Sequence, residues 1–146
     1  MPSASETFSC DATPQQLLER LRDIDFIASL VPEVTKVEHV DERVAQWTVR
    51  VKLGFLVRHS VYRGELLRAD ASGVEFEATG AEARIHGILS FRPRTSATTE
   101  VTMTLEMTGQ GALATIVNNA AQRRLPEDVH RFGASLCSKM TSLPSP

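Results

Sequence analysis

The sequence predicts one α+β domain in which a curved antiparallel β-sheet of about six to seven strands wraps around a long C-terminal α-helix. Two observations lead to this fold class. Apolar residues repeat at helical spacing over roughly the last thirty positions, and apolar and polar residues alternate through the middle of the chain. Because an alternating sheet has one apolar face, that face needs a cover, which the terminal helix can supply.

Length and composition agree with a single globular domain. The chain has 146 residues, of which 42% are hydrophobic, and we assign 1–146 to one domain. Residues 1–5 and 141–146 are expected to fray, because chain ends are poorly ordered unless an element holds them. A formal net charge of −2 provides no field for nucleic acid, so we expect no nucleic-acid partner.

No targeting signal or membrane span is expected. The first residues lack a charged segment followed by an apolar run, and no stretch approaches the roughly 18 apolar residues of a transmembrane helix. Cys10 and Cys137 are the only cysteines, and they lack the spacing of a redox or metal motif. They favour a reducing, cytoplasmic location with two buried, inert thiols, and the alternative is a disulfide between the first strand and the last helix.

The N-terminal segment predicts a short strand at 6–10 followed by two short helices. Asp11 or Thr13 can cap the first helix, and Pro14 suits its first position because a helix leaves that N–H unpaired in any case. The second helix is expected at 26–30. Further strands are expected at 34–39, 46–55, 56–68, 74–78, 83–92 and 101–108.

Two of these elements have irregular patterns. Alternation is imperfect in the strand at 56–68, which predicts a bulge or a partly solvated inner face. The last helix is expected from Gln110 to Met140 and contains Pro126. A proline inside a helix removes a backbone donor, so it predicts a kink near Arg124 or Leu125, or two abutting helices.

Three short motifs accompany this order of elements. They are Ala12-Thr13-Pro14-Gln15-Gln16-Leu17-Leu18, then Leu30-Val31-Pro32, and the paired stretches Val49-Arg50-Val51-Lys52-Leu53-Gly54 and Tyr62-Arg63-Gly64. Together they resemble the helix-grip pattern of the START-like (SRPBCC) superfamily, over roughly residues 6–140. Within that superfamily the sequence is most similar to the family of the G-type subunit of carbon monoxide dehydrogenase.

The resemblance implies a hollow between sheet and helix that holds a hydrophobic small molecule. It does not imply one reaction, since the superfamily includes lipid carriers, cyclases and hydrolases. Family members usually lack a proline at the position of Pro126, and several carry a hydrophobic tail that this chain does not show before Pro146.

Alternation and helical spacing select the residues that are expected to line such a hollow, although each could instead simply fill the core. They are Trp47, Val51, Phe55, His59, Phe76, Ile85, Leu89, Phe91, Met103, Leu105, Ile116, Val117 and Ala120. The indole N–H of Trp47 needs a partner when it is buried, which suits a position beside a cavity.

Polar side chains that could orient a ligand come from the same strands and the last helix: His59, Tyr62, Arg63, His86, Asn118 and Asn119. His86 shares its strand parity with Arg84 and Ser90 and is expected to be exposed. The histidines and cysteines show no metal-ligand spacing, and the chain contains no Walker, GxGxxG or GxSxG motif. No cofactor, metal or catalytic residue is therefore expected.

Three functions remain open at this stage. The first is a carrier or accessory protein that binds a hydrophobic or amphipathic molecule. The second is an assembly or maturation factor for a molybdenum-type dehydrogenase, acting through its surface, and the third is a small polyketide cyclase-like or hydrolase-like enzyme. The sequence ranks them in that order, with an enzyme the least expected, and leaves monomer and homodimer both open.

Overall fold

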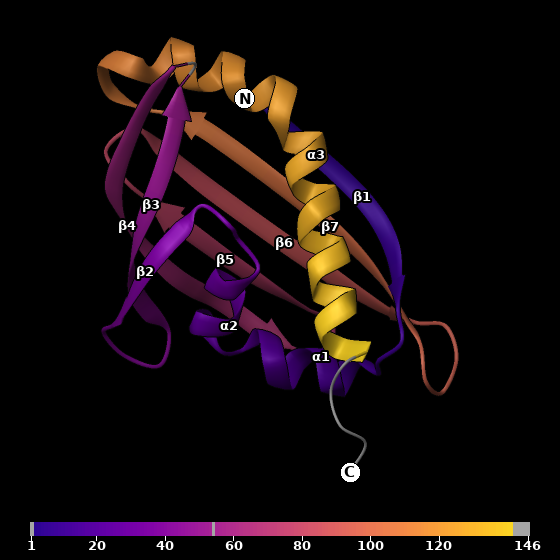
Figure 1. Ribbon diagram of the computed structural model, residues 1–146. Coiled ribbons are helices and arrows are strands. Elements are labelled where there is room, and N and C mark those ends of the chain that lie inside the picture. The colour runs from indigo at the N-terminus through magenta and orange to yellow at the C-terminus, as the bar shows by residue number, and fades with distance from the viewer. Residues whose placement is uncertain (1, 54, 142–146) are drawn as a thin grey trace.

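A seven-stranded antiparallel sheet curves around one long helix, as the fold class predicted (Figure 1). The computed structural model describes residues 2–53 and 55–141. In chain order its elements are β1 (Ser3–Cys10), α1 (Pro14–Leu21), α2 (Ile24–Ser29), β2 (Val34–His39), β3 (Val44–Leu53), β4 (Leu56–Asp70), β5 (Gly73–Thr79), β6 (Ala83–Pro93), β7 (Thr99–Gly109), the 3₁₀ turn η1 (Gly111–Leu113) and α3 (Ala114–Thr141).

The sheet is a meander closed at one side by the first strand. Its strand order is β1-β7-β6-β5-β4-β3-β2, so only β1 pairs with a strand that is distant in the sequence. In the β3–β4 hairpin, Trp47 lies opposite Tyr62 and Val51 lies opposite Arg58. Residues directly opposite each other point to the same face, so this register decides which β4 side chains face the inside.

Local capping explains why α1 begins where the sequence predicts. Thr13 accepts a hydrogen bond from the backbone N–H of Gln16 at 3.1 Å, and the Gln16 side chain accepts one from the Thr13 N–H at 2.9 Å. Pro14 occupies the first turn. The helix buries Leu17 and Leu21 and packs against β4, β5 and β6, so this end of the sheet has a filled core.

The last helix is continuous but not straight. It runs over 28 residues with Pro126 inside it, and Figure 1 shows that it changes direction along its length. The sequence left open a kink or two abutting helices, and the structure has one bent helix. Proline accounts for the bend because its ring lacks an N–H and crowds the preceding turn. Leu125 and Val129, on either side of the proline, are both buried.

The N-terminal strand is longer than expected. It begins at Ser3, which lies opposite Glu106 of β7, so residues 3–5 are part of the sheet rather than frayed. The backbone pairing to β7 holds them in place. At the other end, α3 reaches Thr141, and residues 142–146, also expected to fray, lie outside the described residues.

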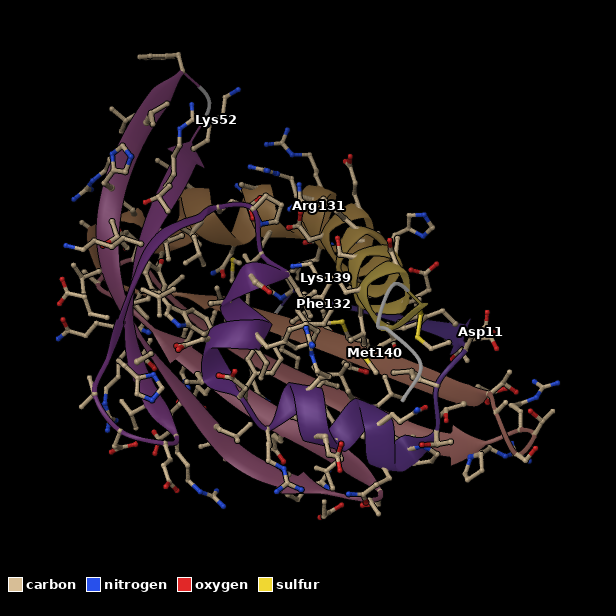
Figure 2. All side chains as sticks on the ribbon, turned by 60° about the horizontal axis from the view of Figure 1, so that its bottom comes forward. Asp11, Lys52, Arg131, Phe132, Lys139 and Met140 are labelled. Carbon is tan, nitrogen blue, oxygen red and sulfur yellow. A yellow bond between two sulfur atoms is a disulfide. The ribbon has the colours of Figure 1, made fainter. Side chains whose placement is uncertain are left out.

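A disulfide joins the two ends of the fold. Cys10, at the end of β1, is bonded to Cys137 in α3, with their Cα atoms 4.9 Å apart (Figure 2). The expectation of two inert thiols is therefore wrong, and the alternative is right. The two elements approach closely because Gly133 has no side chain: a Cβ there would lie 2.7 Å from the Phe8 ring. The expected reducing compartment rested on unpaired thiols and loses that support.

Candidate functional site

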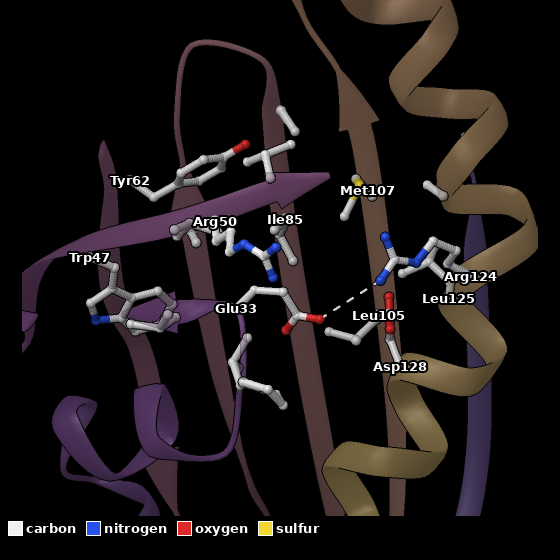
Figure 3. Close-up of a pocket in the computed structure, with 18 of the residues that line it drawn as sticks. Glu33, Trp47, Arg50, Tyr62, Ile85, Leu105, Met107, Arg124, Leu125 and Asp128 are labelled. Carbon is white, nitrogen blue, oxygen red and sulfur yellow. Dashed lines mark ion pairs between the residues drawn. The ribbon is translucent and has the colours of Figure 1, made fainter. Parts of the chain in front are cut away.

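A cavity of about 190 Å³ lies between the inner face of the sheet and α3 (Figure 3). Apolar side chains of β3, β5, β6, β7 and α3 form most of its wall, and the segment 30–34 before β2 closes one side. Several of these wall residues are small, notably Ala78, Ala83, Ala120 and Ala121. Short side chains leave space here, whereas the larger ones under α1 and α2 fill the other end of the sheet.

Most residues that were expected to line the hollow are in this wall. They are Trp47, Val51, Phe76, Ile85, Leu105, Val117 and Ala120. Three others, Leu89, Phe91 and Met103, do face the inside but lie in the packed core, not at the cavity. Leu89 is opposite Met103 in the β6–β7 pair, and both are completely buried. The correct parity could not reveal that the core closes over this part of the sheet.

Phe55, His59 and Ile116 lie outside the cavity. Phe55 follows the end of β3 in a turn and is fully exposed, and Ile116 in the first turn of α3 is 53% exposed. His59 points to the outer face with Val57 and Val61. The reason is that the hairpin register turns the even-numbered residues of β4 inward, which leaves the apolar odd-numbered residues exposed.

The inward residues of β4 meet a buried carboxylate. Glu82 lies in the turn between β5 and β6, is only 4% exposed and forms part of the cavity wall. Its Oε1 accepts a hydrogen bond from the Ser60 hydroxyl, and its Oε2 accepts one from the Tyr62 hydroxyl at 3.2 Å. The sheet therefore brings three polar groups together at one end of an apolar space.

Glu82 is ionised at neutral pH. Burial acts to raise the pKa of its carboxyl, but hydrogen bonds from Ser60, its own backbone and Tyr62, together with the charge of Arg58, lower this pKa below the ordinary value. For Tyr62, burial raises the pKa of the phenol, and the neighbouring Glu82 charge raises it further. The pair is thus a carboxylate beside a neutral phenol.

The phenol pKa leads to a test, because Tyr62 is the only tyrosine. We expect no phenolate absorbance from the folded protein at the ordinary value of 10.0, and a normal titration after denaturation. A pKa that is raised in the folded state contributes stability below the unfolded pKa and loses it as the pH rises through the folded pKa. Ultraviolet titration of folded and denatured protein measures both.

Replacing Glu82 by Gln provides the control for this titration. It removes the charge but keeps the burial, so the shift of the Tyr62 pKa should become smaller without vanishing. A folded wild type whose phenol titrates like the denatured chain would contradict this arrangement.

A second polar group lies at the rim of the cavity. The Glu33 Oε1 is 2.6 Å from Nη2 of Arg131 and 3.9 Å from Nη2 of Arg124, and Arg131 also contacts Oδ1 of Asp128 at 3.2 Å. Figure 3 shows Glu33 facing Arg124 and Asp128 of α3, with Arg50 of β3 on the near side. Burial raises the pKa of Asp128 despite the neighbouring Arg131.

Of the predicted polar residues, Tyr62 alone is in the cavity wall. Arg63 is exposed and pairs with Glu65, while His86 on the outer face is partly buried beside Glu75 at 2.6 Å rather than exposed. The Asn118 side chain accepts a hydrogen bond from the Gly109 N–H, which ties the start of α3 to β7, and Asn119 is exposed.

Sequence reasoning missed Ser60, Glu82, Glu33 and Arg131. The imperfect alternation at 56–68 was the available signal for Ser60. The structure has a register shift between Leu66 and Arg68 and places polar residues on the inner face nearer the hairpin turn. Glu82 and Glu33 lie in connecting segments, where periodicity carries no information about direction.

Trp47 has an unusual environment in the cavity wall. Its side chain is 3% exposed, and among the described residues its Nε1 has no hydrogen-bond partner. The ring lies over Gly64, where an added Cβ would be 2.6 Å from it. Within 2–53 and 55–141, no group of three or more His, Cys, Asp or Glu side chains could hold a metal ion, and no helix is long and apolar enough to cross a membrane.

Solved structures share this architecture at low sequence identity. A conserved protein from Geobacillus kaustophilus has a TM-score of 0.75 at 11% identity, with 95% of each chain covered. A START superfamily protein from Mycobacterium smegmatis has a TM-score of 0.67 at 13% identity, covering 94% of this chain and 98% of that one. The Zhui aromatase/cyclase of a Streptomyces species has a TM-score of 0.63 at 15% identity, covering 95% and 93%.

Family membership comes from the sequence. Among curated proteins none is significantly similar to this chain. The model of the family described as polyketide cyclase / dehydrase and lipid transport, however, matches residues 1–136. The chain therefore belongs to the polyketide cyclase / dehydrase and lipid transport family and has a START-like helix-grip fold.

Proposed function

We propose that the protein binds a hydrophobic or amphipathic small molecule in the cavity between the sheet and α3. The observation that supports this most strongly is an apolar space of about 190 Å³ whose charged wall residues lie at the rim and at Glu82. An engineered apolar cavity of ~150 Å³ is enough to hold benzene. The present cavity suits a ligand, or the apolar part of one, with about the bulk of one or two fused rings.

The first experiment looks for a molecule that the protein carries when purified. Native mass spectrometry and an organic-solvent extract should both reveal a bound apolar or amphipathic compound, released on denaturation. A preparation denatured and refolded in clean buffer is the control and should lack it. Recovery of no compound, together with no uptake of apolar dyes by the refolded protein, would remove the proposal.

An enzymatic role is less well supported. The family description and the name of the Streptomyces structure include cyclases. In this chain the carboxylate in the cavity has a lowered pKa, which makes it a weak general base at neutral pH. Binding requires only the cavity and its polar groups, so it is the simpler account.

An accessory role beside an oxidoreductase remains a hypothesis that rests on sequence motifs alone. It comes from the resemblance to the family of the G-type subunit of carbon monoxide dehydrogenase. A pull-down of a candidate molybdenum hydroxylase with the tagged protein tests it, and absence of association would count against it.

A further inference from the structure

We propose that Glu82 recognises a hydrogen-bond donor on the ligand, either a hydroxyl or a protonated amine. This inference rests on the proposed function, because it concerns the ligand of the same cavity. It goes further in assigning a chemical group to that ligand and one side chain to its recognition.

The hydrogen bonds of Glu82 leave acceptor capacity unused. A carboxylate has roughly four acceptor positions. The hydroxyls of Ser60 and Tyr62 and the backbone of Glu82 itself fill up to three of them. Since Glu82 also lines the cavity, a further donor can reach it from the ligand side.

The polarity of this end of the cavity is determined by the same contacts. Ser60 and Tyr62 already donate their hydroxyl hydrogens to Glu82, so the cluster presents an acceptor rather than a donor to the cavity. A buried carboxylate whose closest partners are neutral hydroxyls is costly, because it has lost its hydration. A donor on the ligand would offset that cost, whereas a ligand carboxylate placed here would meet a like charge.

The lowered pKa of Glu82 favours recognition over proton abstraction. A carboxylate that holds its charge firmly is a strong acceptor but a weak base. We therefore assign binding and orientation to Glu82, with Ser60 and Tyr62 holding its carboxylate in place.

Three naphthalene derivatives, substituted at one position, test the proposal: naphthol, its methyl ether and naphthylmethylamine. Each displaces the neutral dye N-phenylnaphthylamine from the refolded protein. Naphthol or the protonated amine should bind about tenfold more tightly than the ether, the difference expected for one hydrogen bond to a charged acceptor. The two donor arms distinguish a hydroxyl ligand from a cationic one.

Variants assign the discrimination to the carboxylate. Glu82→Gln should reduce the advantage over the ether to about threefold or less for naphthol, and by more for the amine. Glu77→Gln is the matched control, because Glu77 pairs with Arg84 at 2.9 Å and is not part of the cavity wall. It should leave the discrimination unchanged. Tyr62→Phe tests whether the phenol is the recognition group instead.

The outcomes separate the two proposals. If the dye and all three compounds fail to bind, the proposed function fails. If they bind but the ether equals both donors in wild type, or if Tyr62→Phe removes the discrimination while Glu82→Gln retains it, the inference about Glu82 is overturned and the cavity proposal stands. The wild-type comparison decides the matter even if a variant fails to fold.

Discussion

Replacing both Cys10 and Cys137 by serine is expected to lower the free energy of unfolding by about 4 to 5 kcal/mol. The bond closes a loop with a sequence separation of 127, and in the chain-entropy model a long loop removes much of the freedom of the unfolded chain. For a chain of this size, that loss corresponds to a decrease in melting temperature of roughly 10 to 20 °C. Thermal melts of the oxidised wild type and the double variant measure it.

A reducing agent provides the control for the cysteine experiment. It should lower the melting temperature of the wild type towards that of the double variant, and it should leave the double variant unchanged. Thiol labelling of unfolded, unreduced protein should detect no free cysteine. Two labelled thiols per chain and no effect of reductant would contradict the bond.

Replacing Ala120 by Phe is expected to weaken ligand binding by about a hundredfold, a difference of roughly 2.7 kcal/mol. Ala120 belongs to the cavity wall on α3, and a phenyl ring there would occupy space that the ligand needs. The fold should tolerate the change or become about 0.5 to 2 kcal/mol more stable, because filling a cavity adds contacts. Binding and stability would then change in opposite directions.

Ala134→Phe is the matched control for Ala120→Phe. Ala134 lies on the same helix, is exposed and is not part of the cavity wall. Dye displacement should give wild-type affinity for this control, and chemical denaturation reports the stability of both variants. Unchanged affinity in folded Ala120→Phe would mean that the ligand binds elsewhere.

Elements defined by nearby residues could be predicted well. Thr13 and Pro14 start α1 as expected because a capping box and a first-turn proline act within one helical turn. The alternation around Trp47 likewise identified its neighbour Val51 as a wall residue. In each case the information lies within a few residues along the chain.

Parity failed where the usual relation between polarity and burial is reversed. In β4 the apolar residues Val57 and Val61 are exposed, while Ser60 faces the inside. The hydrophobic pattern therefore suggested the wrong face for His59. Only pairing with β3, which places Tyr62 opposite Trp47, determines the orientation of the strand.

By itself the sequence determined the fold class, the order of its elements and the bend expected at Pro126, because each depends on local periodicity or backbone chemistry. The tertiary structure decided the bond between Cys10 and Cys137, the contact of Glu82 with β4 and the remaining free volume. These features join residues far apart in the chain. Strand register and side-chain packing set such distances, and neither can be read from the spacing of residues along the chain.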